Sequence, residues 1–149
     1  MLKNLISKSV SLALISAGIT PVANADYKVN DVSVNNPKGT TIENSQITDQ
    51  YNGAVMLDNG GTFDIINHGT LSGTTSSKFS VSAYIKSNTT VTNLTNTGTI
   101  SGSTDSNVGV GIVVSSSTLT NLTNTGTITG TAANLVAYGL MASNSSTIT

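Results

Sequence analysis

Apolar and polar positions recur along this chain with a period of about 28–30 residues, a size typical of a stacked array of structural repeats. The segment 92–102, Thr-Asn-Leu-Thr-Asn-Thr-Gly-Thr-Ile-Ser-Gly, returns nearly unchanged at 120–130. A weaker copy at 67–73 lies one period before the first, and a fainter one at 39–42 lies a further period upstream. The chain therefore contains several copies of one structural unit.

Each repeat contains two apolar patterns. The first is a short segment that starts apolar and ends in a polar turn, and it occurs at Val55–Asn59, Tyr84–Asn88, Ile112–Ser116 and Leu140–Asn144. The second has apolar residues at matching offsets: Phe63, Val91, Leu119 and Ile148; Ile65, Leu94 and Leu122; and Leu71, Ile100 and Ile128. Val, Ile, Leu and Thr at regular places favour β-strands over helices.

These patterns predict an all-β fold, a parallel β-solenoid of about four coils. In such a fold, equivalent positions of successive coils stack about 4.8 Å apart in parallel ladders, so a repeated apolar position becomes an interior column. The sequence does not decide which face of the first-pattern strand points inward. When the first pattern is aligned from its first residue, one position holds residues of different polarity: Leu57, Lys86, Val114 and Ala142.

A repeated Asn-Thr-Gly sequence marks one corner of each coil. Asn67, Asn96 and Asn124 occupy equivalent positions, and we expect their side-chain amides to form a ladder along the stack. The glycine two residues later suits a bend whose backbone dihedral angles other residues resist.

The chain divides into three parts. Residues 1–25 are predicted to be a signal peptide, with Lys3 and Lys8 at its start, an apolar centre, and Ala-Asn-Ala before a cleavage site preceding Asp26. A retained membrane anchor is the alternative, although the apolar run is well short of the ~20 residues of a spanning helix. Residues 26–50 are predicted to be an N-terminal cap or first coil, with a disordered linker as the alternative.

Residues 51–149 hold the repeats, and the last four residues match 117–120, so the sequence stops in mid-coil. We therefore expect a fragment or truncated product; the alternative is a short solenoid closed by a partner.

Low charge limits the class of partner. Only 9% of residues are charged and 4% are aromatic, and residues 26–149 carry four lysines against seven acidic residues, a net charge of −3. No lysine or arginine follows Lys86, whereas a nucleic-acid binder needs clustered cations to neutralise phosphates. The absence of cysteine excludes a disulfide framework, a thiol nucleophile and a thiolate metal site.

The Asn-(Thr/Ser)-Gly-Thr-Ile-(Ser/Thr)-Gly repeats, alternating with short Gly- and aliphatic-rich strands behind a signal peptide, resemble the passenger region of bacterial autotransporters of the AidA-like, adhesin type. The resemblance covers roughly residues 39–149. It implies a right-handed parallel β-helix, type V secretion through the periplasm, a C-terminal translocator barrel as partner, and display at the cell surface or release. No barrel is expected here, because the last sixty residues hold a single aromatic, Tyr138.

No catalytic, cofactor-binding or metal-binding residue is predicted. His68, the only histidine, fills a corner position that Thr97 and Thr125 fill in other coils. Asp58 and Asp64 flank Gly60-Gly61 but lack the spacing of calcium-binding β-roll repeats. Asp49 could be grouped with them only by guesswork, and the serines lack the partners of a catalytic triad.

We therefore expect a non-enzymatic protein that acts in adhesion, through a host-surface or glycan ligand, or in self-association. A secreted carbohydrate-active β-helix enzyme is the alternative. A flat threonine array that binds ice or another surface is a third hypothesis, although Thr-rich pairs are confined to the Asn-Thr-Gly-Thr part.

Overall fold

A computed structural model describes residues 29–44, 51–76 and 79–149 of the chain. Every regular element within these ranges is a β-strand. The strands are β1 (Val29–Asn30), β2 (Val34–Asn36), β3 (Thr41–Asn44), β4 (Tyr51–Asn52), β5 (Val55–Leu57), β6 (Thr62–Asn67), β7 (Thr70–Thr75), β8 (Phe79–Lys86), β9 (Thr90–Asn96), β10 (Thr99–Thr104), β11 (Gly109–Ser115), β12 (Thr118–Asn124), β13 (Thr127–Ala132), β14 (Ala137–Ser143) and β15 (Thr147–Ile148). The described part of the chain contains no helix of the length and apolarity needed to cross a membrane.

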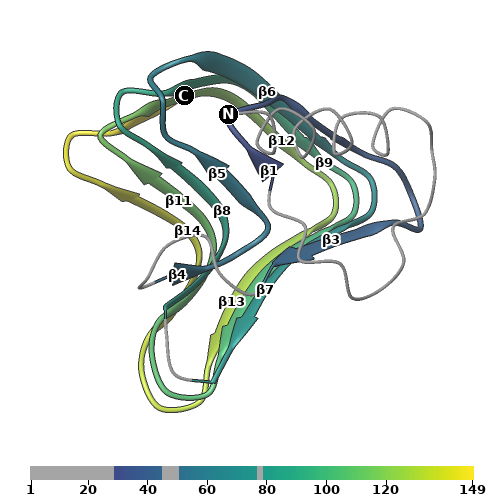
Figure 1. Ribbon diagram of the computed structural model, residues 1–149, viewed down its shortest axis with the longest axis vertical. Helices are drawn as coiled ribbons and strands as arrows, with labels where there is room; N and C mark the ends of the chain where they lie inside the picture. The colour runs from purple at the N-terminus through teal and green to yellow at the C-terminus, as the bar shows by residue number, and fades with distance from the viewer. Residues whose placement is uncertain (1–28, 45–50, 77–78) are drawn as a thin grey trace, which may run out of the picture.

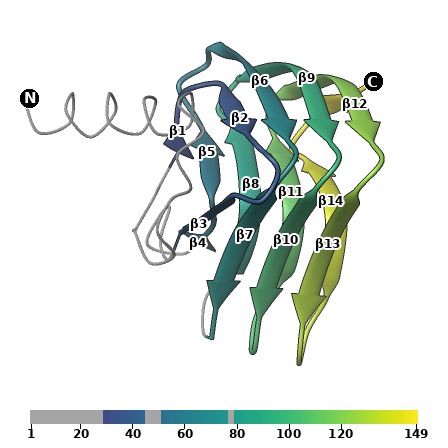
Figure 2. The same ribbon diagram turned by 90° about the vertical axis from the view of Figure 1, so that its right-hand side faces the viewer.

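The strands form three parallel sheets that run along one stack (Figure 1). The first has the order β1-β5-β8-β11-β14 with β4 also paired to β8, the second β2-β6-β9-β12-β15, and the third β3-β7-β10-β13. Successive strands of a sheet belong to successive coils, as the rungs seen side by side in Figure 2 show. The predicted parallel β-solenoid of about four coils is confirmed.

The solenoid is right-handed. Figure 2 places the early strands at one end of the stack and the late strands at the other, so the early coils lie nearest the viewer in Figure 1. There the chain passes from β9 to β10 and on to β11 in a clockwise turn while it recedes, which is a right-handed screw.

The predicted interior columns are present, and their registers are direct pairings between neighbouring coils. Phe63, Val91, Leu119 and Ile148 stack in one column, and Ile65, Leu94 and Leu122 in the next. Leu71, Ile100 and Ile128 stack in the third sheet, where Ile42 extends the column by one coil. Leu94 and Ile100 are completely buried, while residues of the last coil such as Leu122 are only partly buried. Burial of these side chains is the main stabilising contribution.

The alignment of the β8 segment in the sequence was wrong by one residue. Leu57 pairs with Ile85 and Ile85 with Val114, and all three are completely buried. Lys86 instead pairs with Ser115. The conflict in polarity disappears, because the lysine belongs to the outward column and the isoleucine to the inward one.

The asparagine ladder is present and longer than predicted, because Asn36 begins it. Each amide Nδ2 donates to the Oδ1 of the next coil at 2.7 Å, from Asn36 to Asn67, from Asn67 to Asn96 and from Asn96 to Asn124. The same amides also donate to the backbone carbonyls of Thr70, Thr99 and Thr127 at 3.0 to 3.1 Å. The ladder satisfies buried polar groups that would otherwise oppose folding.

The reason for glycine at this corner differs from the expectation. Gly69, Gly98 and Gly126 do not adopt positive φ angles. A Cβ added to Gly98 would lie 2.0 Å from the carbonyl oxygen of Gly69, and one at Gly126 would lie 2.1 Å from that of Gly98. Glycine is required because the backbone corners stack too closely for any side chain.

The predicted signal peptide, residues 1–25, lies outside the described residues. Within the segment 26–50, strands β1, β2 and β3 pair with β5, β6 and β7 of the next coil.

Candidate functional site

His68 occupies the corner position predicted for it. Its backbone amide donates to the carbonyl of Asn36, as the amide of Thr97 donates to that of Asn67. The imidazole is exposed, and its Nδ1 lies 2.7 Å from the Thr97 hydroxyl oxygen. Across residues 29–44, 51–76 and 79–149, no group of three histidine or carboxylate side chains could hold a metal ion.

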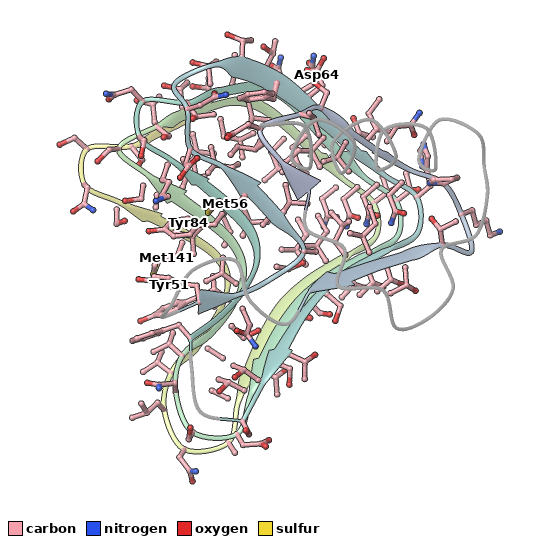
Figure 3. All side chains as sticks on the ribbon, in the orientation of Figure 1. Tyr51, Met56, Asp64, Tyr84 and Met141 are labelled. Atoms are coloured by element: carbon pink, nitrogen blue, oxygen red, sulfur yellow. The ribbon has the colours of Figure 1, made fainter. Side chains whose placement is uncertain are left out.

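Asp58 and Asp64 contact different partners. The carboxylate of Asp58 forms an ion pair with Lys86 at 3.4 Å. The Oδ1 of Asp64 accepts hydrogen bonds from the backbone amide and the side-chain amide of Asn93, both at 3.0 Å. Asp64 lies at the top of Figure 3. The third carboxylate considered, Asp49, lies outside the described residues. The structure therefore gives these carboxylates local, structural partners.

A hydroxyl face lies on the outside of three strands of the third sheet, β7, β10 and β13. Its columns pair in register through β7, β10 and β13, and the residues between its columns are a buried or half-buried Leu, Ile or Gly. The hydroxyl face consists of Thr70, Ser72 and Thr74; Thr99, Ser101 and Ser103; and Thr127, Thr129 and Thr131. Strand geometry spaces these hydroxyls by about 4.8 Å between coils and about 6.6 Å along each strand. This regular lattice carries no charge.

An aromatic groove lies on the outside of the first sheet, at the concave side of the cross-section in Figure 3. The groove has a volume of about 280 Å³. Its lining consists of Tyr51, Phe79, Val81, Tyr84, Val108, Val110, Val113, Ser115, Tyr138, Met141, Ser143 and Asn144. Four of the six aromatic residues of the chain therefore gather on one surface.

Close contacts between the first and third sheets shape the aromatic groove. The backbone near the start of β11 and β14 lies against two glycines of the third sheet, Gly102 and Gly130. A Cβ at Gly102 would be 2.1 Å from the carbonyl oxygen of Val110, and one at Gly130 would be 2.4 Å from that of Tyr138. Because no side chain fits between these backbones, the first sheet approaches the third at this end and leaves a concave outer surface.

The aromatic rings of the groove hold one another in place. The ring centroid of Tyr51 lies 5.4 Å from that of Phe79 and 5.1 Å from that of Tyr84. The Tyr84 hydroxyl interacts with Tyr51 and with Ser115, and Asn144 donates to the Ser115 hydroxyl at 3.0 Å. Burial, followed by the interaction with Tyr51, raises the pKa of the Tyr84 hydroxyl above its usual value.

The described lining of the groove is uncharged. None of its lining residues is acidic or basic. Among the described residues, the cation that contacts it is Lys86, whose Nζ lies 5.7 Å from the centre of the Tyr84 ring and is paired with Asp58. Phe79 follows Tyr51 by one period of the repeat and pairs with it, so this part of the groove had a signal in the sequence that the prediction missed.

Comparison with protein-family models, with curated proteins and with solved structures finds no match. The fold and these two surfaces therefore carry the functional interpretation.

Proposed function

We propose that this protein is the passenger part of an autotransporter-like surface protein that acts by adhesion and not by catalysis. It would be exported behind the signal peptide predicted at residues 1–25, cross the periplasm, and be held at the cell surface or released. The observation that carries the proposal is the right-handed parallel solenoid with an uncharged hydroxyl face repeated in register on three successive strands, β7, β10 and β13.

A repeated face suits adhesion because weak contacts add along the stack. The coils of β7, β10 and β13 present hydroxyl groups at the same height. A ligand surface that contacts one rung can therefore contact the next without reorientation, and the effective concentration for the later contacts is high. Thr99 shows the arrangement, since it pairs with Thr70 on one side and with Thr127 on the other. The stacked backbone and the asparagine ladder supply the rigidity that such a face requires.

Export and adhesion can be tested separately. For export, the full chain is expressed in a Gram-negative host, and cell fractions are analysed by mass spectrometry. We expect the product outside the cytoplasm with Asp26 as its first residue. An intact N-terminus on cytoplasmic protein would contradict the export part of the proposal.

For adhesion, beads coated with the purified chain are allowed to settle on epithelial cells, and the attached fraction is measured under flow. The variant Thr99→Ala/Ser101→Ala/Ser103→Ala removes the hydroxyls of one rung of the hydroxyl face, and we expect weaker attachment with an unchanged melting temperature. Thr95→Ala, on a neighbouring sheet, is the matched control and should attach like the unmodified chain. Equal attachment of beads coated with an unrelated protein would refute adhesion.

A further inference from the structure

We infer that the aromatic groove binds a neutral oligosaccharide. The inference deepens the proposed adhesive role and rests on it, because it identifies one surface and one class of ligand through which a displayed solenoid would attach. The composition, charge, length and shape of the groove each bear on the identity of the ligand.

The composition of the groove matches the two-sided chemistry of a sugar ring. A pyranose has C–H faces that pack on aromatic rings and an edge of hydroxyls that need hydrogen-bonding partners. The groove offers aromatic surface from Tyr51, Phe79 and Tyr138, and a polar margin that includes Ser143 and Asn144. Tyrosine suits such a site because it combines an apolar ring with a hydroxyl. A few polar groups around an apolar floor are the usual design of ligand sites.

Charge favours a neutral ligand over an anionic one. Within residues 29–44, 51–76 and 79–149 the lining contains no basic residue, and the ammonium group of Lys86 is already paired with Asp58. No lysine or arginine follows Lys86 in the sequence. A sulfated or uronic-acid glycan, a nucleic acid or an anionic lipid surface would bring charges that these described residues do not neutralise.

The length of the groove suits a short linear chain of sugars. Its lining comes from four successive strands of one sheet, β4, β8, β11 and β14. Three ladder spacings of ~4.8 Å separate them, which gives a length of about 14 Å along the stack. A single sugar would leave much of this length empty, whereas a short oligosaccharide could contact Tyr51 at one end and Tyr138 at the other.

The shape argues against a second copy of the chain as the occupant. A symmetric dimer places the same surface of both copies together, so the surface must be complementary to itself. The groove is concave, and two concave surfaces placed face to face enclose a void. An extended glycan chain, in contrast, can fill the aromatic groove.

Binding is tested on the full purified chain by isothermal titration calorimetry with chitotetraose, cellotetraose and maltotetraose, and with tetragalacturonate as the charged comparator. We expect at least one neutral tetrasaccharide to bind and the charged one to bind at least ten-fold more weakly. Because the chain has no tryptophan, its tyrosine emission gives a second readout. Three of its four tyrosines line the groove.

Tyr138→Ser should weaken binding at least ten-fold, since it removes one ring from the groove. Val136→Ser is the matched control: this neighbouring residue is 51% exposed, against 43% for Tyr138, and does not line the groove. Absence of binding by all three neutral probes, equal binding of the charged probe, or unchanged binding by Tyr138→Ser would overturn the inference. So would a dimer, seen by sedimentation, that Tyr138→Ser abolishes.

These outcomes are separable from failure of the proposed function. If no neutral probe binds but coated beads still attach to cells, the groove assignment fails and the adhesive role stands. If the probe binds but the chain stays in the cytoplasm and beads do not attach, the displayed adhesive role fails and the site remains.

Discussion

The substitution Asn96→Asp tests the asparagine ladder with almost no change in side-chain volume. Asn96 is completely buried. Its Nδ2 donates to Asn124 Oδ1 at 2.7 Å, to the Thr127 carbonyl at 3.0 Å and to the Gly98 carbonyl at 3.3 Å. Its Oδ1 accepts from Asn67 Nδ2 at 2.7 Å. Aspartate keeps the acceptor and replaces the donor with an oxygen that faces three other oxygens.

The expected loss follows from these contacts. The two shorter donor bonds contribute about 1 kcal/mol each, and a partner left without a hydrogen bond adds about 1–3 kcal/mol. A charged group that is buried without a cation costs several kcal/mol more unless it is neutralised. We therefore expect Asn96→Asp to lower the free energy of unfolding by about 4 kcal/mol or more, which is large for a single substitution.

Asn124→Asp is the matched control. Asn124 is exposed, and its Nδ2 donates only to the Gly126 carbonyl at 3.3 Å within the described ladder, while its Oδ1 can still accept from Asn96. The same change one coil further along should cost about 1 kcal/mol or less. Urea unfolding of the full chain, followed by circular dichroism, gives both values. Equal losses for the two variants would refute the role assigned to the ladder.

Three further predictions concern the core, the corner and the groove. Leu94→Ala should cost about 2–5 kcal/mol because the side chain is fully buried, whereas Thr95→Ala, on the outer face, should stay within about 0.5 kcal/mol; the same urea titration measures both. Gly98→Ala should cost at least about 2 kcal/mol, because its Cβ would lie 2.0 Å from the Gly69 carbonyl oxygen, and a melting temperature equal to that of the unmodified chain would contradict this. The raised pKa of Tyr84 means that the folded state resists deprotonation of this hydroxyl. The hydroxyl therefore contributes fully to stability below the unfolded pKa of 10.0, and this contribution is lost as the pH rises towards the folded pKa. Tyr84→Phe should flatten the decline of the unfolding free energy at alkaline pH.

The sequence predicted those parts of the fold where matching residues are similar in successive coils. Leu94 and Leu122, and Asn96 and Asn124, pair in the predicted register because a parallel stack places equivalent residues directly over one another. The β8 segment was misaligned for a physical reason. Val55 pairs with Ala83 and not with Tyr84. Because every residue from Ser80 to Ala83 is buried, the polarity of these residues does not mark where the inward pattern begins.

Features that depend on three-dimensional approach were not predictable from the pattern. The requirement for glycine at position 98 comes from the neighbouring coil and not from its own dihedral angles. The groove depends on a close approach of two sheets at Gly102 and Gly130. The period of the repeat does not predict that approach. Its aromatic residues are also unequally repeated: Tyr138 stacks on Val110 and Val81, so only Tyr51 and Phe79 form an aromatic pair one period apart. The absence of predicted catalytic, cofactor or metal residues stays a prediction.

The most direct test of the stacked register is disulfide cross-linking, because the chain contains no cysteine of its own. Thr95 and Thr123 pair in adjacent coils and alternate with inward residues. Their Cα atoms should therefore lie about 4.8 Å apart on one face, within the range that a disulfide spans. Thr120 lies three residues before Thr123, which places it about 10 Å from Thr95 along the strand.

Mild oxidation of the double variant Thr95→Cys/Thr123→Cys, analysed by mass spectrometry after digestion, should give nearly complete intramolecular cross-linking. The double variant Thr95→Cys/Thr120→Cys should give little. Equal cross-linking of the two pairs, or none in the first, would contradict the stacking of matching residues on which the solenoid, the hydroxyl face and the groove depend.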